Sequence, residues 1–130
     1  MPLKPEVRNA IFGKLKSSLE KQCPPMVCVK DKADSYEIIG NKPVPYGSTK
    51  KIVPGMYFAS VVARKDMVSF YFMPIYYDKK NYETIAPTLL KSLKGKACFN
   101  FKKEEQVNVR ELADLLDRGA RVWKKREYMK

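Results

Sequence analysis

Residues 56–77 read MYFASVVARKDMVSFYFMPIYY, and this stretch decides the fold class. Two runs of aromatic and β-branched residues, Met56–Ala63 and Met67–Met73, are separated by the three residues Arg64–Asp66. Such residues favour β-strands, and a three-residue link is a normal length for a hairpin. The stretch therefore predicts two adjacent antiparallel strands near the middle of the chain.

A second sheet signature lies at Gly95–Lys102, which reads GKACFNFK and predicts a strand over Ala97–Phe101. Shorter strands are predicted at Met26–Lys30, Tyr36–Ile39 and Lys50–Val53. Between the last two, Lys42–Thr49 contains two prolines and a glycine. Because proline has no backbone N–H to donate, this segment is expected to be a sheet edge or a loop.

Two segments before the last strand have the spacing of amphipathic helices. Apolar residues recur at helical intervals over Pro5–Gln22 and over Tyr82–Lys94. The polar residues Asp78–Asn81 are predicted to form a loop that leads into the second of these helices.

The closing helix has the clearest signals in the chain. Asn108 is predicted to be its N-cap, with Glu111 as the partner in a capping box. An apolar stripe follows at helical spacing, and the helix is expected to end near Arg126.

The predicted order of elements is helix, several strands, helix, strand, helix. Strands joined by short links pair antiparallel, and amphipathic helices must bury their apolar stripes against the sheet. We therefore predict an α+β fold. It is a single two-layer domain over residues 1–130, with a mainly antiparallel sheet packed against N-terminal, middle and C-terminal helices.

Composition narrows the classes of function. The chain has no histidine, which excludes the usual Ser-His-Asp and Cys-His pairs and the commonest neutral metal ligand. We expect no metal, no cofactor and no catalytic residues. Three cysteines without an export signal favour reduced thiols, and no apolar run approaches the ~20 residues of a membrane helix. A cytoplasmic protein without a membrane partner is expected.

The formal charge of +12 favours an anionic partner, whose identity the sequence leaves open. Basic residues are dense at the end of the chain, where the ordinary interpretation is a solvated helix terminus. The alternative is a nucleic-acid interface formed with neighbouring aromatic residues. Its contacts would be Arg118, Arg121, Lys124, Lys125 and Arg126.

Strand alternation predicts a ligand-binding face. Side chains on a strand point alternately to opposite faces of the sheet, so the phenylalanines of Met67–Met73 and Ala97–Phe101 are expected under the helices. The opposite face would then carry polar groups among aromatic rings, as small-ligand sites do. The predicted ligand-binding residues are Ser60, Ser69, Tyr71, Cys98 and Asn100, with Lys96 as a charged contact. The alternative is the ordinary polar face of an antiparallel sheet.

Cys98 is the candidate for reactivity, because nearby lysines lower the pKa of a thiol. No histidine is present to accept its proton. A thiol-dependent enzyme that uses Cys98 is therefore an alternative, and a structural cysteine is the simpler interpretation.

Four stretches of the sequence carry a resemblance to a known family. They are FASV at Phe58–Val61, MPIY at Met73–Tyr76, GKACFNFK at Gly95–Lys102, and the closing-helix leucines Leu112, Leu115 and Leu116. With these stretches the chain resembles the YdhG-like family of small uncharacterised bacterial domains, from roughly Val7 to Lys125. The resemblance implies a single α+β domain, and the family has no established activity to transfer.

These observations lead to one functional expectation with two alternatives. We expect a non-catalytic cytoplasmic binding or interaction domain for a small or macromolecular anionic partner. Nucleic-acid binding through the basic C-terminal helix is the first alternative, and thiol chemistry at Cys98 is the second. Both a monomer and a homodimer are compatible with the sequence.

Overall fold

The computed structural model of this protein describes residues 2–46 and 49–130. The chain begins with helix α1 (Pro5–Glu20), followed by strands β1 (Val27–Lys32), β2 (Ser35–Ile39), β3 (Val44–Tyr46), β4 (Lys51–Val53), β5 (Tyr57–Ala63) and β6 (Val68–Phe72). It continues with α2 (Ile75–Ile85), α3 (Pro87–Leu90), β7 (Cys98–Phe101), the 3₁₀ turn η1 (Glu104–Gln106) and α4 (Val109–Lys125). The predicted edge or loop Lys42–Thr49 includes residues 47–48, which lie outside the described residues.

The α+β fold with an antiparallel sheet is confirmed. Five strands form one sheet in the order β1-β2-β5-β6-β7, and every neighbouring pair is antiparallel. The predicted hairpin is its centre, where β5 and β6 pair from Ala59↔Phe72 to Ala63↔Val68. Strands β3 and β4 pair with each other as a separate hairpin.

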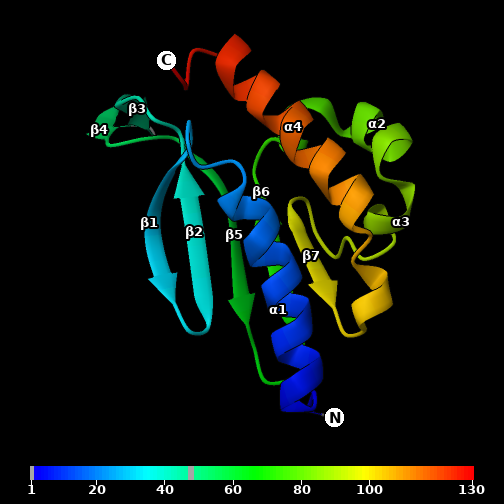
Figure 1. Ribbon diagram of the computed structural model, residues 1–130. Helices are drawn as coiled ribbons and strands as arrows, with labels where there is room; N and C mark the ends of the chain where they lie inside the picture. Colours follow the sequence, from blue (N-terminus) through cyan, green and yellow to red (C-terminus); the bar gives the residue numbers. More distant parts are fainter. Residues whose placement is uncertain (1, 47–48) are drawn as a thin grey trace.

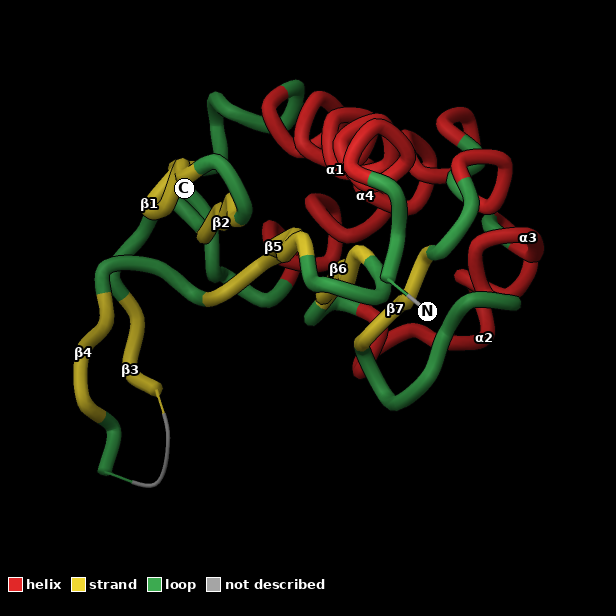
Figure 2. Tube along the Cα trace, turned by 90° about the horizontal axis from the view of Figure 1, so that it is seen from below, coloured by secondary structure: helices red, strands yellow, loops and turns green. Residues whose placement is uncertain are grey.

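The helices cover one face of this sheet. In Figure 2, α1 and α4 lie together on one side, while the β3–β4 hairpin projects toward the other. Helices α2 and α3 pack against α4 near the β7 edge. The sheet therefore has a covered face and an open face, as the alternation of its residues predicts.

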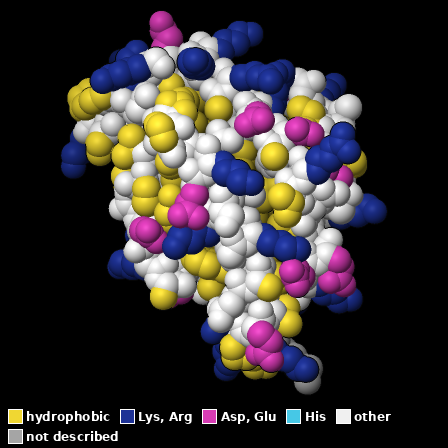
Figure 3. All heavy atoms as spheres, in the orientation of Figure 1, with side chains coloured by type: hydrophobic (Ala, Val, Ile, Leu, Met, Phe, Trp, Pro, Cys, Tyr) yellow, Lys and Arg dark blue, Asp and Glu magenta, His cyan; other side chains and the backbone are white. Residues whose placement is uncertain are grey.

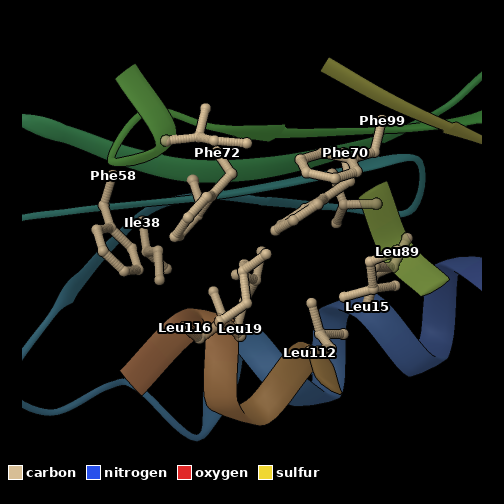
Figure 4. Packing of buried hydrophobic residues seen from close by; sticks show 14 of the residues in the cluster. Leu15, Leu19, Ile38, Phe58, Phe70, Phe72, Leu89, Phe99, Leu112 and Leu116 are labelled. Atoms are coloured by element: carbon tan, nitrogen blue, oxygen red, sulfur yellow. The ribbon is translucent and has the colours of Figure 1, made fainter. Parts of the chain in front are cut away.

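The covered face is made of aromatic rings. The phenylalanines of β5, β6 and β7 meet the leucines of α1 and α4 in one continuous core (Figure 4). Phe58, Phe72, Phe99 and Phe101 are fully buried, and Phe70 is nearly so. Burying each such side chain stabilises the fold by about 1.5–3 kcal/mol.

Helix α4 packs closely against the sheet at Gly119. A methyl group built on Gly119 would lie 2.5 Å from Cζ of Phe72 and 3.1 Å from Cε1 of Phe58. Glycine costs about 1 kcal/mol relative to alanine inside a helix. That cost is accepted here because a larger residue would push α4 away from the phenylalanine face.

The middle of the chain differs from the prediction. Asp78–Asn81, predicted as a loop, lie inside α2, although Asp78 itself departs from helical geometry with φ −155° and ψ 32°. The predicted helix Tyr82–Lys94 is broken at Ala86, which has φ −133° and ψ 58°. Proline disfavours helical geometry in the residue before it, and Pro87 follows directly. A new short helix, α3, begins at Pro87.

The start of α4 confirms one predicted cap and corrects another. Oδ1 of Asn108 accepts the backbone N–H of Glu111 at 3.1 Å, as expected of an N-cap. The Glu111 carboxylate does not close a local capping box. Its Oε1 accepts the backbone N–H groups of Thr88 and Leu89, at 2.9 and 3.0 Å, and so joins α3 to α4.

None of the helices in the described part of the chain is long and apolar enough to cross a membrane.

Replacing Gly119 by alanine tests the close approach of α4. We expect Gly119→Ala to lower the free energy of unfolding, because overpacking costs about 1–3 kcal/mol and exceeds the ~1 kcal/mol that alanine gains in a helix. Urea unfolding would measure the difference. The matched control is Gly13→Ala in α1, where an added methyl group meets nothing within 4 Å and is expected to stabilise the protein. Equal effects of the two substitutions would contradict this account.

Candidate functional site

The open face brings together the polar residues predicted for it. Across the strands, Ser60 pairs with Tyr71, Tyr71 pairs with Cys98, and Ser69 pairs with Asn100. Paired residues of antiparallel strands project from the same face. The five side chains therefore form two adjacent rows on the face opposite the helices.

A chain of hydrogen bonds connects these rows. Nε of Arg64 donates to Oγ of Ser69 at 3.1 Å, and that hydroxyl donates to Oδ1 of Asn100 at 2.9 Å. Nη2 of Arg64 donates to the hydroxyl of Tyr71 at 2.6 Å. The Cys98 thiol also donates to Oδ1 of Asn100, at 3.5 Å. The arginine thereby holds both rows in place.

Sequence reasoning placed Arg64 in the hairpin link and assigned it no role in the site. Two signals were available. Arg64 has the same strand parity as Ser60 and Val62, and it directly follows β5, from where a long side chain can cross to β6. No carboxylate among residues 2–46 and 49–130 forms an ion pair with it.

A groove of about 580 Å³ runs over the open face beside these rows. Its floor is formed by β1, β2, β5 and β6, and the β3–β4 hairpin seen in Figure 2 forms one wall. Four tyrosines line it, namely Tyr46, Tyr57, Tyr71 and Tyr76. The other lining residues are Val29, Glu37, Ile39, Val53, Pro54, Gly55, Phe72, Met73 and Ala97. We call this feature the tyrosine groove.

Two β-bulges shape the floor of the tyrosine groove. The register of β1 against β2 shifts between Cys28 and Lys30, and that of β2 against β5 shifts between Ile38 and Ile39. The second bulge leaves Phe58 without a cross-strand partner in β2 and turns it into the core, where it is fully buried. Bulges bend a strand and re-aim its side chains. Tyr57 therefore lies on the open face, beside Ser60.

Tyr57 is the titratable group most affected by the groove. Burial raises the pKa of its hydroxyl to about 12, and a hydrogen bond with the hydroxyl of Ser60 acts in the opposite direction. The phenol is therefore neutral at physiological pH and able to donate or accept a hydrogen bond.

The predicted set and the tyrosine groove overlap at Tyr71. Among the described lining residues, Tyr71 is the one member of the predicted set. Ser60 and Ser69 are buried, Cys98 and Asn100 are half-buried, and Lys96 lies exposed in the turn before β7. Tyr46, Tyr57 and Tyr76 lie outside the predicted ligand-binding set, and the hairpin and the start of α2 bring Tyr46 and Tyr76 to the groove from distant parts of the sequence. The role of Lys96 as a charged contact stays a prediction.

The basic C-terminal residues have different surroundings from one another. Nε of Arg118 pairs with Oδ2 of Asp78 at 2.8 Å, and the guanidinium of Arg126 lies 3.9 Å from the ring centroid of Tyr77. The other three predicted contacts, Arg121, Lys124 and Lys125, are exposed. On the face covered by α1, lysines and arginines are dispersed among acidic residues (Figure 3).

No protein-family model, curated protein or solved structure matches this chain. The resemblance to the YdhG-like family stays a prediction. Functional assignment therefore rests on the geometry of the open face and on the charges around it.

The raised pKa of Tyr57 predicts a loss of stability at alkaline pH. The folded protein holds this proton up to about pH 12, whereas the unfolded chain releases it near the ordinary value of 10.0. Between these values the unfolded state binds fewer protons, so stability present below pH 10 is lost as the pH rises through that range. We expect Tyr57→Phe to make this loss less steep, by up to about 1.4 kcal/mol per pH unit. Urea unfolding at a series of alkaline pH values would measure it.

Tyrosinate absorbance provides the direct check. The difference between the titrations of the unsubstituted protein and Tyr57→Phe isolates this hydroxyl. Ser60→Ala removes the hydrogen bond that lowers the Tyr57 pKa, and should move its titration to higher pH. A Tyr57 that ionises near pH 10 in the folded protein would contradict the burial argument.

Proposed function

We propose that this protein is a non-catalytic binding protein whose open sheet face takes a small ligand with an aromatic or apolar body and an anionic group. The observation that carries the proposal is the position of Arg64. Its guanidinium donates to the hydroxyl of Tyr71, a lining residue of the tyrosine groove, and it pairs with no carboxylate of the described residues.

The tyrosine groove suits the body of such a ligand. Its volume of about 580 Å³ lies within the ~300–1,000 Å³ that is common for small-molecule sites. Tyr46 and Tyr76 are 52% and 54% exposed, so their rings are accessible for stacking. Exposed aromatic rings over a floor that is apolar apart from Glu37 favour a flat ligand.

Arg64 suits the anionic group. A guanidinium has five N–H donors, and the two hydrogen bonds to Ser69 and Tyr71 leave the others for a ligand. Planar donors of this kind match the oxygens of a carboxylate or phosphate. The net charge of +12 adds long-range attraction for anions.

An aromatic carboxylate and its neutral amide test the roles of the groove and of Arg64 separately, because only the carboxylate carries an anionic group. We expect 2-naphthoate to bind more tightly than 2-naphthamide in isothermal titration calorimetry. Arg64→Gln should weaken 2-naphthoate by about 10-fold, the effect of losing roughly 1.4 kcal/mol of a charge-assisted contact. The affinity for 2-naphthamide should remain unchanged.

Lys65→Gln is the matched control, because it removes the same charge from the neighbouring exposed position in the same turn. Its affinity for 2-naphthoate should stay within about two-fold of the unsubstituted protein. Equal losses in Arg64→Gln and Lys65→Gln would show a general charge effect and remove Arg64 from the site. No binding of either naphthalene compound would overturn the proposal for the groove.

Nucleic-acid binding is a second candidate, favoured by the hollow between α2 and the end of α4. Its volume is about 450 Å³, and its lining includes Arg118, Lys125, Arg126 and Tyr77, together with Asp78, which pairs with Arg118. The Tyr77 ring is 43% exposed and already carries a guanidinium on one side. Rings and cations together are typical of surfaces that bind single strands.

Fluorescence anisotropy with a labelled single-stranded oligonucleotide tests this candidate. We expect the affinity to fall steeply with salt, and the double substitution Lys124→Gln/Lys125→Gln to weaken binding and reduce the salt slope by about 2. The control Lys50→Gln/Lys51→Gln removes two exposed charges from the β3–β4 hairpin. Equal binding by both double variants would contradict a specific role for the end of α4.

The cytoplasm is the proposed compartment, supported by the three cysteines, all of which are free. Thiol catalysis at Cys98 receives little support, because the thiol donates to the amide oxygen of Asn100, which is not a base.

A further inference from the structure

Another hollow lies along β7, beside the polar row that contains Ser69 and Asn100. It has a volume of about 460 Å³ and is lined by Met67, Lys91, Ser92, Lys94, Asn100, Lys102 and Gln106. None of these residues lines the tyrosine groove. We call it the basic hollow, because three of its seven lining residues are lysines and none is acidic.

Backbone hydrogen bonds fix the main-chain segment that carries Lys91 and Lys94. The N–H of Lys94 donates to the carbonyl of Cys98 at 2.8 Å, and the N–H of Asn100 donates to the carbonyl of Ser92 at 3.0 Å. The segment after α3 is thereby fixed beside β7. No carboxylate among the described residues forms an ion pair with Lys91, Lys94 or Lys102.

Two amides in the basic hollow have a fixed orientation. Oε1 of Gln106 accepts the backbone N–H groups of Lys102 and Lys103, at 2.8 and 2.9 Å. The Ser69 hydroxyl accepts from Arg64, so its own proton goes to Oδ1 of Asn100. Both amide oxygens are occupied, which makes the NH₂ groups the available ends. The hollow is therefore lined by two amides with oriented NH₂ groups and by three lysines.

We infer that the basic hollow binds the phosphate group of a small phosphate monoester. Like charges held together without a carboxylate attract a compact anion strongly. A phosphate at neutral pH carries nearly two negative charges and three strong acceptor oxygens. It suits a site with five donor groups better than a carboxylate does, because a carboxylate has one negative charge and two oxygens. This site goes beyond the proposed function, since it shares no lining residue with the tyrosine groove and can fail independently of it.

Titration with inorganic phosphate and with phenyl phosphate, followed by amide chemical shifts, tests the inference. Chloride at matched ionic strength provides the baseline. We expect saturable shifts centred on Lys94, Asn100 and Lys102. The triple substitution Lys91→Gln/Lys94→Gln/Lys102→Gln should weaken both phosphates by at least ~10-fold. Lys51→Gln, an exposed lysine on β4, should leave their affinities within about two-fold.

Gln106→Glu is a near-isosteric test of the oriented amide. Its carboxylate can still accept the two backbone N–H groups, but it replaces the available NH₂ with a negatively charged oxygen. We expect this variant to lose phosphate binding while its thermal unfolding remains cooperative. Phosphate affinity equal to that of the unsubstituted protein would overturn the inference.

A single-stranded oligonucleotide distinguishes the source of the phosphate. Saturable binding of inorganic and phenyl phosphate, lost in the triple variant, supports a small-molecule ligand. If the oligonucleotide binds and loses affinity in the triple variant, while neither small phosphate binds, the inference of a small-molecule site is overturned. The absence of saturable binding by all three probes would also overturn it. The naphthoate experiment does not use these residues, so its result remains independent.

Discussion

The packing of the phenylalanine face against α4 is the constraint on which the other features depend. Phe58 and Phe72 lie against Gly119, where an added methyl group would collide with the Phe72 ring and crowd that of Phe58. Trp123, one turn later, stacks edge-on against Phe58 and is fully buried. Because α1 and α4 bury one face of the sheet so completely, its polar residues must project from the other. The functional possibilities of this protein therefore lie on the open face and at its edges.

The open face carries a groove, which a flat polar sheet would lack. Two bulges bend its strands, and the β3–β4 hairpin stands beside them to form a wall. Arg64 then connects β5 and β6 through Ser69 and Tyr71. Buried polar groups are favourable when each has a partner, and here Arg64 donates to Ser69 and Tyr71 while Ser69 donates to Asn100. The same network positions Asn100 at the basic hollow and Tyr71 at the tyrosine groove, so the two features are held by one framework.

The positive charge is divided between paired and unpaired groups. Lys14 pairs with Glu104, Lys16 with Asp31 and Arg118 with Asp78. Such pairs at the surface contribute little stability, but they lower the local potential. Arg64 and the lysines of the basic hollow have no such pair among the described residues. Charge alone therefore indicates attraction for anions, and the distribution of carboxylates indicates where the attraction is concentrated.

The sequence by itself determined the α+β class, the central hairpin and the two faces of the sheet. Alternation in β6 and β7 is a local property, so Phe70 and Phe99 could be assigned to the core and Ser69 and Asn100 to the opposite face. The cap at Asn108 is equally local. Only the tertiary structure decided that Glu111 caps α3, that Arg64 reaches across to Tyr71, and that Tyr46 and Tyr76 meet Tyr57 over one groove. These contacts join residues from separate elements, and they depend on strand order, bulges and helix packing, which a period of two or 3.6 residues does not encode.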